Sequence, residues 1–211
     1  METPLVAIIR GASALDPAAL TEMLANLAAG ETRVVVIEIE SSAQRQPAPL
    51  EEFRLCALPT VACVSGELTG YALDLALACD IRVAERTAAF VLAEDRLPAL
   101  RRLLGASRGA SLIAPEPRIE AQTARDLGFV WRVAEKGEEM TDSLAIAAQI
   151  GSRGPIATQF AKEAVWRGLD LPLAVALRLE TDLTLLLQTT KDRAEGVRAF
   201  LEKRPPTFLG D

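Results

Sequence analysis

The chain has 211 residues, half of them hydrophobic, which is enough to bury a sizeable core in one large domain or two small ones. A formal net charge of −6 argues against a general nucleic-acid or anionic-membrane surface and suits an ordinary cytoplasmic protein. No histidine is present, which excludes histidine bases, Ser-His and Cys-His pairs and histidine metal ligands. Proton transfer must therefore fall to Asp, Glu, Lys, Tyr, Cys or water.

Strand and helix patterns alternate along the first part of the chain. In chain order they predict a strand over 5–10, a helix over 13–30, a strand over 33–40, a helix over 50–56, a strand over 60–65, a helix over 70–80, and strands over 81–85 and 88–94. Asp16 suits the N-cap of the first helix, and Pro17 its first position. The apolar start of 33–40 favours a strand buried on both faces. This order predicts an α/β fold with parallel strands.

The second part of the chain becomes helical. A helix over 118–128 and a strand over 129–134 are followed, from Thr141 onward, by apolar residues at three- and four-residue spacing. No linker rich in Pro, Gly or Ser separates the two parts. We therefore expect residues 1–140 and 141–211 to form one structural unit, with the second part packed on the first or on a neighbouring subunit.

The cysteines, the tryptophans and the apolar runs are best explained as parts of the folded core. Cys56, Cys63 and Cys79 lie in apolar surroundings without C-x-x-C spacing, so we expect reduced core thiols. Trp131 and Trp166 are also expected in the core. The amino-terminal METPLVAIIRG has no basic region before its apolar run, unlike a signal peptide, and no apolar run reaches about 18 residues. A cytoplasmic location is expected, and no carboxylate cluster has metal-ligand spacing.

The stretch VSGELTGYALDLALACDIRV, residues 64–83, raises the functional question. It places an acid, Asp74, one turn inside a helix that begins at Gly70 between two strands. The segment GYALDLALACDIRVAERTAAFVLAE, residues 70–94, resembles the central signature of the crotonase, or enoyl-CoA hydratase/isomerase, superfamily. Three later segments resemble the family's following parts in the same order, namely RIEAQTARDLGFVWRVAEKGE, GPIATQFAKEAVWRGLDLPLAVALRLE and DRAEGVRAFLEKRPPTFLG.

The resemblance covers most of the chain and implies a fold, an assembly and a ligand. The implied fold is a crotonase-like spiral of ββα turns over 1–140, followed by a helical region over 141–211. The implied assembly is a homo-trimer or hexamer, and the implied ligand is an acyl-coenzyme A thioester, with no metal and no other cofactor. Neither a nucleic acid nor a membrane is an expected partner.

The resemblance also implies an oxyanion hole, in which two backbone N–H groups hold the thioester oxygen. A helix start suits this task because it offers unbonded N–H donors at the positive end of the helix dipole. Here Gly70 begins the helix, and Tyr71 matches the glycine whose N–H completes the hole. The other donor would come from the loop after the second strand, at Ser42 or Ala43, or at Ser41. A tyrosine in place of glycine puts a side chain where the family allows close approach.

Two carboxylates match the family's catalytic glutamates. Asp74 matches the first and is one methylene shorter, and Glu94 matches the second, twenty residues later. Together they would move a proton on and off carbon or activate water. The alternative is structural, with Asp74 as a solvated or capped helix acid and Glu94 as one acid among many at a strand end.

Two loops of the family are shortened in this chain. The Gly-rich loop with an F-x-x-G-A-D-like run is replaced by ESSAQRQPAP, and the P-G-x-G-G-like loop after Glu94 by DRLPALRRLLG. Arg96, Arg101 and Arg102, with Lys203 and Arg204, suit coenzyme A phosphates or a plain solvated face.

Two functions therefore stay open at the level of sequence. The first is an enoyl-CoA hydratase/isomerase-type lyase or isomerase of fatty acid metabolism, with Glu94 as acid/base, Asp74 as its helper and the Tyr71 N–H as an oxyanion donor. The second is a catalytically deficient homologue that binds an acyl chain or assembles with an active crotonase-family enzyme.

Overall fold

A five-stranded parallel sheet forms the centre of the molecule. The computed structural model describes residues 6–12, 16–41, 50–92, 104–105 and 118–211. Its large sheet has the order β1–β2–β3–β5–β8. The strands are β1 (Val6–Ile9), β2 (Val34–Ile39), β3 (Thr60–Val64), β5 (Ile81–Glu85) and β8 (Arg132–Ala134). The parallel pairing predicted from the strand and helix order is confirmed.

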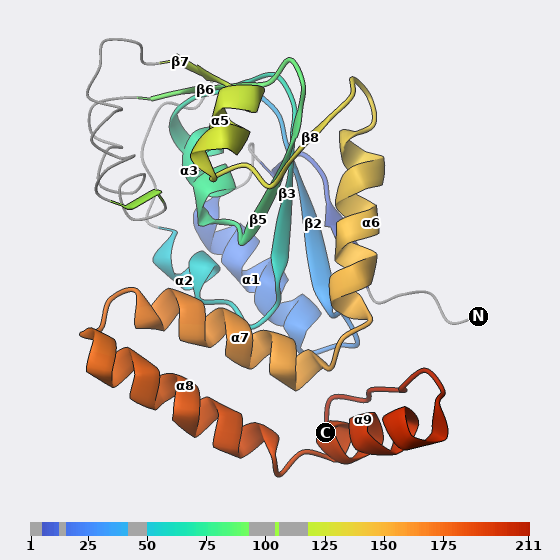
Figure 1. The fold of residues 1–211 in the computed structure, drawn as a ribbon. Helices are drawn as coiled ribbons and strands as arrows, with labels where there is room; N and C mark the ends of the chain where they lie inside the picture. Colours follow the sequence, from blue (N-terminus) through green and yellow to red (C-terminus); the bar gives the residue numbers. More distant parts are fainter. Residues whose placement is uncertain (1–5, 13–15, 42–49, 93–103, 106–117) are drawn as a thin grey trace.

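Helices cover both faces of this sheet (Figure 1). On one face lie α1 (Pro17–Ala28) and α3 (Gly70–Ala78), and on the other lies α6 (Glu139–Gly151). The side chains of β2 alternate between the two faces, as strand geometry requires. Val35 and Ile37 join the larger core cluster with α1 and α3, whereas Val34 and Val36 join a smaller one with α6. This double burial explains the continuous apolar run of β2.

A second, three-stranded sheet follows β3 along the chain. It consists of β4 (Glu67–Leu68), β6 (Ala89–Val91) and β7 (Arg118–Glu120). β6 pairs parallel with β4 and antiparallel with β7. The sequence predicts β6 within 88–94 but misses the other two strands. β4 is too short to show a period-2 pattern, and the prediction extended the helix α5 (Ala121–Leu127) over the residues of β7.

The carboxyl-terminal part of the chain is helical, as predicted. α7 (Pro155–Gly168) lies next to the short α2 (Glu51–Arg54), and α8 (Leu173–Leu187) runs alongside α7 (Figure 1). α9 (Lys191–Glu202) precedes the tail. The tail folds back on α9, where the buried carboxylate of Asp192 accepts the N–H groups of Leu209 at 2.8 Å and Gly210 at 3.0 Å. The guanidinium of Arg33 donates to the Phe208 carbonyl and so fixes the tail to the start of β2.

Two further predictions concern the burial of the tryptophans and the absence of a membrane-spanning segment. Trp166 is buried, as predicted, but the prediction that Trp131 is a core residue is wrong, because its side chain is 69% exposed. Phe129 and Val130 fill the core there, and Trp131 stands at the entry to the edge strand β8. Among the described residues, no helix is both long and apolar enough to cross a membrane.

Candidate functional site

The start of α3 provides backbone N–H donors. Thr69, at the N-cap position, makes no side-chain capping bond, and the first bond within the helix runs from the Leu73 N–H to the Thr69 carbonyl at 3.4 Å. The N–H groups of Gly70, Tyr71 and Ala72 therefore precede the helical bonding pattern. Together with the helix dipole, they favour negative charge at this end of α3.

Gly70 has a backbone conformation that explains its presence. Its φ is +50°, in the left-handed region that other residues adopt at a cost. Gly70 and Thr69 are half-buried, whereas Tyr71, Ala72 and Leu73 are buried. The helix thus begins near the surface and enters the core within one turn.

Tyr71 directs its side chain into the core. The ring is 2% exposed and belongs to the larger core cluster. Burial raises the pKa of the Tyr71 hydroxyl to about 12, with smaller contributions from Asp16 and Cys79. Among the described residues, the hydroxyl has no hydrogen-bond partner. Tyr71, which the resemblance matches to a glycine of the family, therefore places its side chain in the core and its backbone at the helix start.

The structure describes only one of the two predicted catalytic acids. Asp74 lies one turn inside α3 and is half-buried, although the residues around it in the helix are buried. Glu94 lies outside the described residues, as do Ser42 and Ala43. β6 ends at Val91, three positions before Glu94. The catalytic pair and the second N–H donor thus stay predictions.

The loop after β2 contacts the segment that leads into α3. The Ser41 hydroxyl accepts the Glu67 N–H at 2.9 Å and donates to the Glu67 carbonyl at 2.8 Å. Two positions earlier along the same segment, the Ser65 N–H donates to the Ile39 carbonyl at 3.1 Å. These bonds bring together the two segments to which the sequence assigns oxyanion donors. Sequence reasoning missed the role of the Ser41 side chain because no local pattern marks a contact over 26 positions.

A buried network holds the opposite end of α3. Asp80 pairs with Lys162 of α7 at 2.8 Å and accepts the indole N–H of Trp166 at 2.6 Å. Arg82 is buried and donates to the Ala76 carbonyl at 3.1 Å and to the carbonyl of Cys79. The sequence carried one signal for this network, because Lys162 and Trp166 are four positions apart and so share a helix face.

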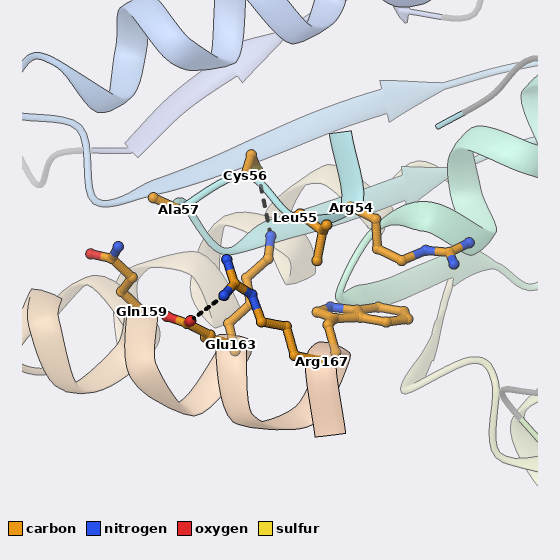
Figure 2. A pocket seen from close by; sticks show the side chains of 9 residues that line it. Arg54, Leu55, Cys56, Ala57, Gln159, Glu163 and Arg167 are labelled. Atoms are coloured by element: carbon orange, nitrogen blue, oxygen red, sulfur yellow. Dashed lines mark hydrogen bonds and ion pairs between the residues drawn. The ribbon is translucent and has the colours of Figure 1, made fainter. Parts of the chain in front are cut away.

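A pocket of about 100 Å³ lies beside this network, between α2 and α7. Figure 2 shows Arg54, Cys56 and Ala57 on one side and Gln159 and Glu163 on the other. The Arg54 guanidinium stacks on the Trp166 ring at 5.0 Å from its centroid. None of the described residues that line this pocket belongs to α3, whose far end at Ala78 lies roughly 12 Å along the helix from Gly70. The pocket is therefore separate from the helix start.

The cysteine thiols are buried or half-buried, and Arg204 of the tail is ion-paired. All three cysteines are free, and burial raises the pKa of the Cys63 thiol to about 11 and of the Cys79 thiol to about 12. The cysteines are free, as expected, but only Cys63 and Cys79 are core residues, because Cys56 is half-buried. Arg204 pairs with Glu195 at 2.6 Å and with Glu202 at 2.6 Å. Arg96, Arg101 and Arg102, the other arginines considered for phosphate contact, lie outside the described residues.

Comparisons with known proteins identify the relatives of this chain. A crystal structure of enoyl-CoA hydratase from Bacillus anthracis superposes with a TM-score of 0.80 at 29% identity and covers all of this chain and 98% of its own. Methylglutaconyl-CoA hydratase of Mus musculus is 35% identical over 167 residues, and 2,3-dehydroadipyl-CoA hydratase of Escherichia coli is 34% identical over 161. These stretches cover 73% and 72% of this chain.

The chain spans 53% of the length of the mouse relative and 63% of that of the E. coli relative. The fold is the predicted crotonase-like α/β fold. The family model described as enoyl-CoA hydratase/isomerase matches residues 28–211, which include every described strand except β1 and all the described helices from α2 onward. The chain therefore belongs to the enoyl-CoA hydratase/isomerase family.

Proposed function

We propose that this protein binds acyl-CoA thioesters and polarises their carbonyl at the start of α3. The observation that carries the proposal is the helix start itself, where Gly70 at φ +50° opens the helix and leaves backbone N–H groups before its first internal bond. The Tyr71 N–H is one donor, and the loop after β2, at Ser42 or Ala43, provides the other. Such donors stabilise the negative charge that develops on a thioester oxygen.

The proposed chemistry is a hydration or isomerisation by carboxylates. Glu94 acts as the acid/base and Asp74 as its helper, because histidine is absent and carboxylates are the remaining pair at family positions. No cofactor beyond the coenzyme A of the substrate is required. Family membership and relatives named as hydratases of CoA thioesters support this assignment. We also propose that the protein acts in fatty acid metabolism and is located in the cytoplasm. The free cysteines are consistent with a compartment that keeps thiols reduced.

A second candidate function is non-catalytic. Asp74 is one methylene shorter than the family's glutamate, and a misplacement of about 1 Å can cost roughly 10²-fold in rate. The chain would then bind an acyl group or assemble with an active family member. The burial of the Tyr71 ring in the core favours the first candidate, since the ring does not compete with a ligand for the helix start.

Binding and turnover measured together distinguish the two candidates. Purified protein is titrated with short and medium enoyl-CoA and acyl-CoA thioesters by calorimetry, and loss of the enoyl thioester absorbance is followed in parallel. We expect binding and turnover in the native protein, and Glu94→Gln should abolish turnover while sparing affinity. Glu135→Gln is the control, because Glu135 is an exposed acid distant in sequence from the helix start.

Each alternative outcome has a separate meaning. Binding without turnover supports the non-catalytic candidate. Turnover that survives Glu94→Gln removes Glu94 from the mechanism. Absence of binding to every thioester refutes the acyl-CoA site itself.

We also propose a homo-trimer or a pair of trimers. Large apolar side chains are exposed on the last two helices and would be covered in an assembly. They are Leu173, Val175, Leu177, Leu185, Leu186, Phe200 and Leu201. Light scattering after gel filtration should give three or six times the 22.6 kDa monomer mass, and Phe200→Asp should lower it. A monomer at micromolar concentration would refute the assembly.

A further inference from the structure

The pocket between α2 and α7 collects cationic side chains. Three of its lining residues are cationic, namely Arg54, Lys162 and Arg167. Among the described residues that line it, only Glu163 carries a carboxylate. The exposed fraction of the cationic side chains falls from 60% at Arg167, through 20% at Arg54, to 8% at Lys162. The pocket therefore leads from solvent to a nearly buried ammonium group.

The two guanidinium groups have more N–H donors than their neighbouring carboxylates can use. Each guanidinium carries five N–H donors. Arg167 contacts Glu163 Oε1 at 3.0 Å, the pair that Figure 2 marks with a dashed line, and Arg54 reaches Glu51 Oε2 at 3.4 Å. The Nε of Arg54 is buried and has no hydrogen-bond partner among the described residues. A buried N–H without an acceptor is costly and indicates a missing partner such as an ion.

An oxyanion supplies the acceptors that this lining lacks. Its oxygens accept paired N–H groups from guanidinium in charge-assisted hydrogen bonds. The stack of Arg54 on the Trp166 ring, at 5.0 Å from its centroid, fixes one guanidinium before a ligand arrives. The pocket volume of about 100 Å³ holds several water molecules, and hence an ion of a few heavy atoms.

We propose that this pocket binds a phosphate-sized oxyanion between Arg54 and Arg167. The Lys162 ammonium stays paired with Asp80 at 2.8 Å and adds positive charge at the base of the pocket. This site shares no described lining residue with the helix start at Gly70. The inference therefore does not depend on the proposed acyl-CoA function.

Two sources of ligand share this chemistry. One is a free inorganic anion, and the other is the phosphate group of a larger organic molecule. Ala57 and Gln159 line both this pocket and a neighbouring cavity of about 650 Å³. That volume is in the range of small-molecule sites and has room for the body of an organic phosphate. Inorganic phosphate and phenyl phosphate are the probes that distinguish the two sources.

Trp166 lines the pocket and reports its occupancy. The chain has two tryptophans, and Trp131 is 69% exposed, so Trp131→Phe leaves Trp166 as the single tryptophan without disturbing the core. The fluorescence of this variant is titrated with each probe at constant ionic strength, with chloride as the balancing ion. We expect a saturable change with phosphate and none when chloride is exchanged for another halide.

Substitutions at two ion pairs locate the site. Arg167→Gln should weaken phosphate binding at least about 10-fold, because a hydrogen bond to a charged group contributes that much. Glu163→Gln should strengthen binding, since it removes the carboxylate that competes for Arg167. The matched controls are Arg132→Gln and Asp142→Asn, which break a 2.8 Å pair whose members do not line the pocket. Both controls should bind phosphate like the native protein.

The Cys56 thiol gives a second readout that does not use fluorescence. Cys56 lines the pocket and is half-buried, whereas the other two cysteines are buried. Iodoacetamide, an uncharged reagent, should label Cys56 more slowly when phosphate saturates the pocket. Chloride at the same ionic strength should leave the rate unchanged.

Each outcome either supports or overturns the proposal. An affinity for phenyl phosphate at least 10-fold above that for phosphate supports an organic ligand, and equal affinities support the free anion. Absence of saturable binding by both probes overturns the site. Equal weakening by Arg167→Gln and Arg132→Gln overturns it as well, because the protein would then respond to net charge alone. Phosphate that leaves the Cys56 rate unchanged also contradicts it. None of these results affects the acyl-CoA site, which turnover tests separately.

Discussion

The indole N–H of Trp166 donates a 2.6 Å hydrogen bond to Oδ1 of Asp80 and joins helix α7 to the end of α3. The other oxygen, Oδ2, accepts the N–H of Thr60 at 2.8 Å and its hydroxyl at 3.0 Å, and pairs with Lys162 at 2.8 Å. One carboxylate thus connects β3, α3 and α7. The end of α3 takes its place from this network as well as from the core around it.

Removing the Asp80 charge should therefore destabilise the protein strongly. Asp80→Asn places an amide N–H₂ among four donors and leaves the Lys162 ammonium, whose side chain is 8% exposed, without its carboxylate partner. We expect a loss of about 3–5 kcal/mol in the free energy of unfolding, measured by urea denaturation.

The control for this variant is Glu135→Gln, which removes the same charge from an exposed pair with Arg86. Because exposed ion pairs contribute little, this variant should cost far less stability than Asp80→Asn. Equal effects of the two variants would show that the Asp80 network is no stronger than a surface ion pair.

The hydroxyl of Tyr71 can be removed at little cost. It is buried and has no hydrogen-bond partner among the described residues. Tyr71→Phe keeps the ring in the core and relieves an unsatisfied polar group, whose burial costs about 1–3 kcal/mol. Thermal melting should show Tyr71→Phe to be as stable as the native protein or more so. A clear drop in melting temperature would mean that the hydroxyl has a partner in solution.

Gly70 should resist substitution for conformational reasons. Its φ of +50° strains any residue with a Cβ, so Gly70→Ala should cost about 1–2 kcal/mol of unfolding free energy. The matched control is Gly196→Ala in the middle of α9, where the new Cβ would meet the Phe208 ring at an ordinary 3.6 Å. That variant should gain up to about 1 kcal/mol. The opposite order of the two stabilities in urea melts would contradict the geometry of the helix start.

The pair of Glu195 and Arg204 should shape stability in acid. Hydrogen bonds from Arg204 and from the Thr207 N–H lower the pKa of Glu195 to about 2, from the usual 4.5. Because the folded pKa is depressed, the contribution is present above about pH 4.5 and is lost as the pH falls toward 2.

Thermal melts between pH 5 and pH 2 measure this effect. The native protein should lose stability more steeply in this window than Glu195→Gln, while Glu22→Gln, an exposed substitution on α1, should follow the native curve. Parallel curves for all three proteins would remove Glu195 from the acid response.

Thiol labelling should follow burial. Burial raises the pKa of the Cys63 thiol to about 11 and of Cys79 to about 12, which keeps both protonated near neutral pH. In the native protein at pH 7.5 only the half-buried Cys56 should react measurably, and its pKa is also raised by burial. In urea all three should react quickly. Fast native labelling in a Cys56→Ser variant would show that the core opens around the other two.

Much of the fold was predictable because its signals are local. The apolar runs of β2 and β3, the Pro17 at the start of α1 and the glycine that ends α5 each reflect a preference of neighbouring residues. The start of α3 at Gly70 belongs to the same class, since a left-handed φ calls for glycine. The family resemblance rests on such short segments in a fixed order.

The sequence by itself determined the strand and helix order and the parallel pairing of the large sheet, and the helix that begins at Gly70. Only the tertiary structure decided that the Tyr71 ring lies in the core, that Trp131 faces solvent, and that Ser41 bonds Glu67 and Asp80 binds Lys162. The physical reason is range. Backbone preferences act over a few residues, whereas the burial and the partner of a side chain depend on segments 26 or 82 positions away, which come together only when the whole sheet has formed.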